Sequence, residues 1–146
     1  MNHRSLHNCL SWLGRVVNRV IKGLVVLCLT MAIAACTTGQ LVYTDEKGDR
    51  RVGCEVEFVG LPSVDKHAVD YALSFCAKSA VKKGYTIDDT QTYLLALDTQ
   101  IPSPPCEQAW HHDLAKAQYK QGQLNAREYG YIVAHIDLGL AAVHRC

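Results

Sequence analysis

Cysteine and histidine are the residues of this chain that are most able to do chemistry. The seven cysteines of the 146-residue sequence are Cys9, Cys28, Cys36, Cys54, Cys76, Cys106 and Cys146. No two of them are spaced Cys-x-x-Cys, so neither the thiol–disulfide redox motif nor the usual zinc knuckle is present. The sequence therefore favours thiols that form structural disulfides, or that are covalently modified, over thiols that catalyse redox reactions.

Three histidines in the last third of the chain are the best candidates for a metal site. His111 and His112 lie in one segment of helical periodicity and His135 in the next, so a helical hairpin would let His112 and His135 face each other. Asp113 would add an oxygen donor, and this ligand set suits zinc or copper. Because adjacent helical residues point about 100° apart, the alternative is that at least one of these histidines is a surface side chain.

The sequence carries none of the common catalytic motifs. It has no serine nucleophile elbow, no glycine-rich phosphate loop and no zinc-protease pair of histidines. A cysteine–histidine nucleophile would require a reduced thiol. We therefore expect neither an enzyme nor a bound cofactor. A deep pocket with converging polar groups and a carboxyl or histidine of shifted pKa would be the sign of one.

The first 35 residues have the composition of a secretion signal. The cations Arg4, Arg15, Arg19 and Lys22 come first, and residues 23–35 are uncharged and mostly aliphatic. At about 1.5 Å per residue, a helix over that run spans roughly 20 Å, which is shorter than a hydrocarbon core of about 30 Å. The pattern predicts a signal peptide over residues 1–35.

The apolar run ends in Ile33-Ala34-Ala35-Cys36, which resembles the lipobox of bacterial lipoproteins. The resemblance implies that residues 1–35 are removed and that Cys36 receives a diacylglycerol group and a further acyl chain such as palmitate. Several acyl chains, at about 0.8 kcal/mol per buried CH₂, give effectively permanent anchoring. The alternative is an uncleaved anchor in which Cys36 is an ordinary small residue.

The residue after Cys36 bears on the membrane that would hold such a lipoprotein. In lipoproteins of Gram-negative bacteria, Asp at this position favours retention in the inner membrane, and here the position holds Thr37. The resemblance therefore implies an outer-membrane lipoprotein that is anchored through its lipid and faces the periplasm.

The oxidising periplasm gives the remaining cysteines a structural role. Two of the seven leave with the signal peptide and Cys36 takes the lipid, so Cys54, Cys76, Cys106 and Cys146 remain. An even number of thiols in that compartment predicts two disulfides, for which three connectivities are open. The helical hairpin expected at the end of the chain favours Cys106 with Cys146, which leaves Cys54 with Cys76. Each bridge contributes about 3–4 kcal/mol in the chain-entropy model.

A β-hairpin is expected at the start of the mature chain. Residues 36–40 are small and polar after the cysteine, which suggests a lipidated tether before one domain over 41–146. Residues 41–44 and 50–59 are strand-like, and Cys54, Val56 and Phe58 alternate with glutamates. The segment between these runs contains Gly48 and is typical of a hairpin turn.

A long helix is predicted to follow the hairpin. Ser63 after Pro62 is the expected N-cap, Asp65 lies in the first turn where it suits the helix dipole, and Gly84 is the expected left-handed stop. The buried stripe is predicted to consist of Ala68, Val69, Ala72, Leu73, Cys76 and Ala80. Residues 86–98 read either as a strand or as a short helix capped by Asp88 or Asp89, and we favour the helix.

The last forty residues predict an antiparallel αα-hairpin. The first helix runs from about Cys106 to Gln121, and Gly122 ends it. Asn125 and Glu128 have capping-box spacing for a second helix, whose apolar face continues to Val143. In such a hairpin the start of the first helix lies near the end of the second, which is the reason for pairing Cys106 with Cys146.

Residues 122–129 carry a second resemblance. Gly122, Leu124, Asn125 and the pair Glu128-Tyr129 resemble the centre of the short C-terminal (SHOCT-type) helical hairpin domain found at the ends of many bacterial proteins. The similarity covers about thirty residues, and the lysine-rich second helix of that domain is absent here. The resemblance implies a small interaction or oligomerisation module.

Together these features predict an α+β fold, with a β-hairpin followed by three or four helices and stapled by two disulfides.

The mature part of the chain is mildly acidic. Four of the 15 basic residues lie in the leader, so the mature part has 11 basic and all 14 acidic residues, a net charge of −3. Without a basic stripe we expect no nucleic-acid binding. We expect a non-catalytic structural or interaction lipoprotein with an envelope partner. The alternative is a small periplasmic metal-binding protein that uses His112 and His135.

Overall fold

The fold, seen in a computed structural model that describes residues 36–146, is α+β as the sequence predicted. The elements in chain order are β1 (Cys36–Thr44), β2 (Arg50–Val59), α2 (Pro62–Lys82), β3 (Thr86–Ile87), the 3₁₀ helix η2 (Asp89–Leu95), α3 (His112–Lys120) and α4 (Ala126–Asp137). The predicted signal peptide lies outside the described residues. Residues 36–146 form one compact unit that contains both disulfides and three hydrophobic clusters.

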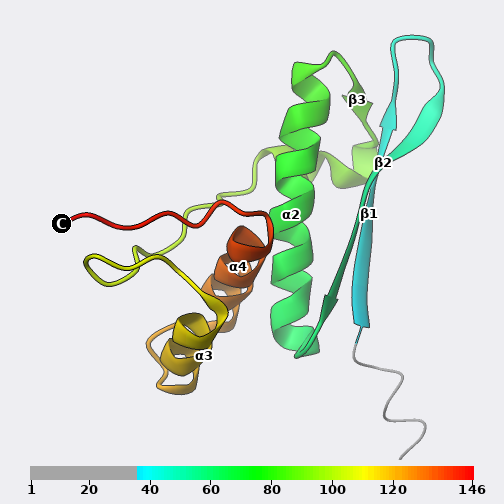
Figure 1. Ribbon diagram of the computed structural model, residues 1–146. Helices are drawn as coiled ribbons and strands as arrows, with labels where there is room; N and C mark the ends of the chain where they lie inside the picture. The colour runs from blue at the N-terminus through cyan, green and yellow to red at the C-terminus, as the bar shows by residue number, and fades with distance from the viewer. Residues whose placement is uncertain (1–35) are drawn as a thin grey trace, which may run out of the picture. The chain divides into compact units, whose positions relative to one another are not determined.

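The elements are arranged around α2. Figure 1 shows α2 between the sheet and α4, with α3 on the far side of α4. No helix in the described part of the chain has the length and apolar character needed to span a membrane.

The sheet has three antiparallel strands in the order β2-β1-β3. β1 and β2 form the predicted hairpin, in register from Cys36 opposite Val59 to Thr44 opposite Arg50. Its turn is held by the Asp45 carboxylate, which accepts two backbone N–H bonds, each 3.0 Å long. The two-residue strand β3 was not predicted, because so short a strand has no periodicity to detect in sequence.

The prediction of a tether at residues 36–40 was wrong, because β1 already begins at Cys36. The reason lies in Gly39, which faces α2. A Cβ atom at this position would lie 2.4 Å from Val69 Cγ1 and 3.0 Å from Leu73 Cδ1. The glycine therefore lets the strand lie directly on the helix, and threonines at 37 and 38 suit a strand as well as a linker.

Helix α2 is buried on two faces rather than one. Val69 and Leu73 belong to the cluster beneath the sheet, and Ala68 and Tyr71 pack against α4. The predicted stripe is confirmed for its buried members Ala68, Val69, Ala72, Leu73 and Ala80. A helix buried on both sides is apolar over most of its circumference, so a single-stripe description covers only part of it.

The ends of α2 agree only in part with the prediction. Its N-cap is Leu61 with no side-chain bond, and Pro62 occupies the first helical turn. Ser63 is therefore not the cap, because proline favours the first helical position and the helix starts two residues earlier than predicted. Gly84 has φ of +85°, which confirms the left-handed stop.

Helix α4 crosses α2 at a glycine. A Cβ atom on Gly130 would lie 2.6 Å from the carbonyl oxygen of Val64 and 3.0 Å from the Cβ atom of His67. Beside this crossing the rings of Tyr71 and Tyr131 lie with their centroids 5.1 Å apart. The absence of a side chain at position 130 therefore sets how closely the two helices approach.

The segment 86–98 and the C-terminal hairpin were predicted in type but not in length. Asp88, one of the two residues expected to cap a short helix here, caps η2 through its side chain. The capping box is confirmed, with Asn125 and Glu128 exchanging bonds of 2.9 and 2.8 Å. However, α3 begins only at His112 and α4 ends at Asp137.

Backbone conformation explains why both helices are shorter than predicted. Glu107 has φ of +60°, which is incompatible with a helix starting at Cys106. Gly139 has φ of +68° and ends α4 before the apolar pattern does. Gly139 is a stop signal that the sequence carries, whereas the turn at Glu107 is held by its backbone hydrogen bond to the distant His144.

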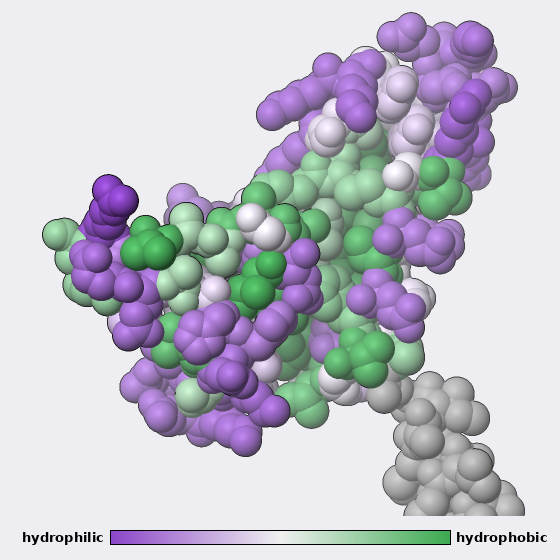
Figure 2. All heavy atoms as spheres, in the orientation of Figure 1, coloured by the Kyte–Doolittle hydropathy of each residue, from purple (hydrophilic) through white to green (hydrophobic). Residues whose placement is uncertain are grey.

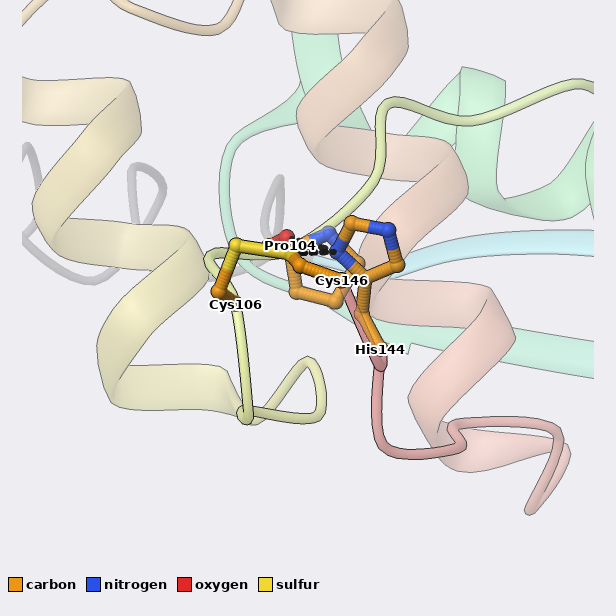
Figure 3. The surroundings of a disulfide bond; sticks show 4 residues. All are labelled: Pro104, Cys106, His144 and Cys146. Carbon is orange, nitrogen blue, oxygen red and sulfur yellow. Dashed lines mark hydrogen bonds between the residues drawn. A yellow bond between two sulfur atoms is a disulfide. The ribbon is translucent and has the colours of Figure 1, made fainter.

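Both predicted disulfides are present, Cys54–Cys76 and Cys106–Cys146. The first joins β2 to α2. The second does not join two helix ends, because Cys106 precedes α3 by six residues and Cys146 follows α4 by nine. The two segments are instead joined by backbone hydrogen bonds of 2.8 Å that His144 makes with Glu107 and Gln108. Figure 3 shows this surrounding, where His144 Nδ1 donates to the carbonyl oxygen of Pro104 at 2.9 Å. The pairing was therefore correct although the predicted geometry was not.

Replacing Gly130 by alanine should destabilise the protein. Its new methyl group would meet the α2 backbone, and overpacking of this kind costs about 1–3 kcal/mol. Helix propensity alone predicts the opposite sign, a gain of up to about 1 kcal/mol. Urea unfolding followed by circular dichroism measures the difference, and a Gly130→Ala variant more stable than wild type would contradict the close crossing.

Each disulfide should contribute substantially to stability. The cysteines of the two bridges are 22 and 40 residues apart in the sequence. For loops of this size, we expect the loss of either bridge to lower the free energy of unfolding by about 3–4 kcal/mol. The double variants Cys54→Ala/Cys76→Ala and Cys106→Ala/Cys146→Ala, compared by urea unfolding, test this. Peptide mapping without reductant should recover the same two pairs, and any other pairing would contradict the structure.

Candidate functional site

The main cavity of the described domain lies at the end of the sheet where β1 begins. Its volume is about 540 Å³, and the end of β2, the first turn of α2, and helices α3 and α4 line it. This volume falls within the range of small-ligand sites. Figure 2 shows hydrophobic side chains over the middle of the domain, and hydrophilic ones over the tip of the β1–β2 hairpin and over the lower left of the view.

Much of the cavity wall is apolar. Phe58 and Leu61 contribute from β2 and the loop after it, and Val133 contributes from α4. Tyr119 and Tyr129 stack with their ring centroids 4.5 Å apart and 13° between the ring planes. This stacked pair fixes one wall of the cavity, because each ring holds the other in place between α3 and α4.

Asp65 is the buried acidic group of the cavity lining. It is only 6% exposed, and its Oδ2 atom has no hydrogen-bond partner among the described residues. Burial raises the pKa of this carboxyl, and a hydrogen bond from the Gly60 backbone opposes that rise. Burying a carboxylate that has one oxygen without a hydrogen bond is costly, so the fold keeps a destabilising group at this position.

The exposed side chains of the cavity carry both signs of charge. His112 Nε2 lies 2.9 Å from Asp137 Oδ1, and Lys116 and Lys120 line the same cavity from α3. Glu57 lines it from β2. These groups suit a polar or charged portion of a ligand at the mouth, while the tyrosines and aliphatic side chains suit an apolar portion.

Cys36 lies beside this cavity. Its Cα partner in the sheet is Val59, which lines the cavity. The pKa of the Cys36 thiol is raised, mainly by its hydrogen bond to Glu57. The negative charges of Glu57 and Asp65 raise this pKa further. The predicted lipidation residue and the cavity therefore share one end of the domain.

The three predicted metal-binding histidines lie in three different surroundings. His111 caps α3 through its side chain, and His112 pairs with Asp137. His135 lies with Nδ1 2.8 Å from the hydroxyl of Tyr71, and burial lowers its pKa. Residues 135 and 137 are about 200° apart around α4, so the groups they contact lie on opposite sides of it.

The three histidines therefore do not come together around one possible metal position. Within residues 36–146, no three histidine, cysteine, aspartate or glutamate side chains are grouped so as to hold a metal ion. The predicted oxygen donor Asp113 is exposed in the first turn of α3. His112 and His135 both lie within the observed helices, but His135 contacts Tyr71 of α2, and Asp137 is the α4 residue that His112 contacts.

Sequence reasoning missed Asp65 as a site residue, although a signal was present. It was assigned to the helix dipole, which its place in the first turn of α2 supports. It also lies three and four residues before Ala68 and Val69, on the side of the helix that is buried. A carboxylate at a core-facing helical position is uncommon and indicates either a paired charge or a functional group.

No protein family, curated protein or solved structure matches the chain. The chemistry of the cavity is therefore argued from its residues alone. Its lining contains no serine, threonine or cysteine side chain, and its histidine is exposed and paired with a carboxylate.

Asp65→Asn should stabilise the domain near neutral pH. A carboxyl whose pKa is raised by folding binds more protons in the folded than in the unfolded state, so wild-type stability falls as pH rises through the raised pKa. The variant has no such loss and should gain about 1 kcal/mol near pH 7, with the gain shrinking towards pH 4. Urea unfolding at both pH values measures it.

Asp113→Asn is the matched control, because Asp113 also lies in the first turn of a helix but is exposed. It should show no stabilisation at either pH. Equal effects of the two substitutions, or a pH-independent effect at Asp65, would show that helix electrostatics and not burial governs this carboxyl.

Proposed function

We propose that this chain is the precursor of an outer-membrane lipoprotein that is anchored through lipid on Cys36 and faces the periplasm. The observation that carries the proposal is the division of the cysteines. Among residues 36–146, Cys36 is exposed and is the cysteine outside the disulfides, whereas the four later cysteines are joined in two disulfides. This is the division expected of a chain that is acylated at one thiol and oxidised at the others.

The leader supports the same proposal from the sequence. Its cations, its short apolar run and the lipobox-like Ile33-Ala34-Ala35-Cys36 stand in the order that secretion and acylation require. Thr37 in place of aspartate after the cysteine favours the outer membrane by the same resemblance.

In the periplasm the domain acts as a non-catalytic interaction protein of the cell envelope. Supporting this role, the main cavity has apolar walls and charged side chains at its mouth, but no serine, threonine or cysteine nucleophile in its lining. The mature part has a net charge of −3, which disfavours nucleic acid as its partner. The partner is therefore an envelope protein or a small envelope component.

Acylation is tested by intact mass spectrometry of the protein extracted from bacterial membranes. We expect the mass of residues 36–146 plus a diacylglycerol group and a further acyl chain. Treatment with reductant should then add about 4 Da, as two disulfides take up four hydrogens.

The matched control is Cys36→Ser, which removes the acceptor thiol and leaves the leader and the disulfides unchanged. It should lack acyl mass, should retain residues 1–35, and should not be processed at this site. Full-length wild-type protein without acyl groups and with reduced cysteines would contradict the proposal.

A further inference from the structure

The position of Cys36 leaves no linker between the proposed anchor and the folded domain. Cys36 is the first residue of β1, and it pairs across the sheet with Val59. A flexible tether would let the domain take any orientation over a membrane. An acylated first strand residue instead holds one end of the domain within a few ångströms of the headgroups.

That end of the domain exposes apolar side chains next to Cys36. Val59, its cross-strand neighbour, is 69% exposed, and Leu61 is 53% exposed in the loop that follows β2. Exposed apolar residues occur elsewhere too, among them Val52, so exposure alone does not mark a contact surface. The distinguishing feature is that Val59 and Leu61 are continuous with the residue that would carry the lipid.

The charged groups at the same end also suit a phospholipid surface. Lys116 and Lys120 are exposed on α3 and line the same cavity as Val59 and Leu61. Lysines beside apolar side chains place their ammonium groups at phosphate level while their stems remain in less polar surroundings. Glu57, which accepts a hydrogen bond from the Cys36 thiol, is an anionic group of the kind that pairs with the ammonium of phosphatidylethanolamine.

We propose that the end of the domain formed by Cys36, Val59, Leu61, Lys116 and Lys120 lies on the membrane, with Val59 and Leu61 entering the headgroup region. The proposal rests on the proposed lipid anchor. It fixes the orientation of the domain, because the β1–β2 turn at residues 45–49 lies at the opposite end of the hairpin and points into the periplasm. The mouth of the main cavity then lies close to the bilayer.

Tryptophan quenching tests this orientation with a matched pair of variants. Val59→Trp and Val52→Trp both replace an exposed valine of β2, seven residues or about 23 Å apart along the strand. The native Trp110 is buried and gives the same background in both. In residues 36–146, Cys36 is the sole cysteine outside the disulfides, so its thiol can be coupled to a maleimide lipid.

The domain is coupled to vesicles of phosphatidylethanolamine and phosphatidylglycerol that contain a brominated lipid. We expect Val59→Trp to lose roughly half of its added fluorescence, as a side chain at interfacial depth would, and Val52→Trp to keep it. Equal quenching of the two variants, or no quenching at position 59, would overturn the inference.

The same two variants are also expressed from the whole chain, extracted from membranes as acylated, processed protein and reconstituted in these vesicles. This second measurement does not depend on the isolated domain. Because acylation is established separately by mass spectrometry, a correctly acylated protein without quenching at position 59 would reject the orientation and leave the proposed function standing. Protein without acyl groups would instead reject the proposed function.

Discussion

The burial of α2 on two opposite faces is the interaction on which the rest of the structure depends. One face covers the sheet, where Gly39 lets β1 approach and Cys54–Cys76 ties β2 to the helix. The other face meets α4 at Gly130. A domain of this size has a small core, and a single helix shared by two hydrophobic clusters lets both clusters stabilise the same element.

This central helix also positions the candidate site. The first turn of α2 brings Asp65 to the cavity between β2 and the α3–α4 hairpin, and the loop before it exposes Leu61 beside the start of β1. The proposed anchor, the apolar rim and the buried carboxyl therefore meet at one end of the domain. A buried carboxylate with one oxygen left without a hydrogen bond lowers stability, and a group of this kind in a cavity is a candidate functional residue.

Much of the fold could be predicted because local signals and global packing agree. Alternation over β2 reflects one buried face, and the capping box of Asn125 and Glu128 satisfies backbone groups within one turn. The prediction failed where a distant contact overrides a local preference. Residues 36–40 look like a linker until α2 is placed against Gly39, and the helix expected from Cys106 is prevented by the turn at Glu107.

The sequence by itself determined the number of paired cysteines, the α+β class and the order of its main elements, since these follow from composition, periodicity and capping over a few residues. Only the tertiary structure decided that β1 starts at Cys36, that the histidines do not converge, and that Asp65 is a buried cavity residue. These features depend on how closely segments far apart in the chain approach one another. Such distances are set by packing of whole elements, which no local pattern encodes.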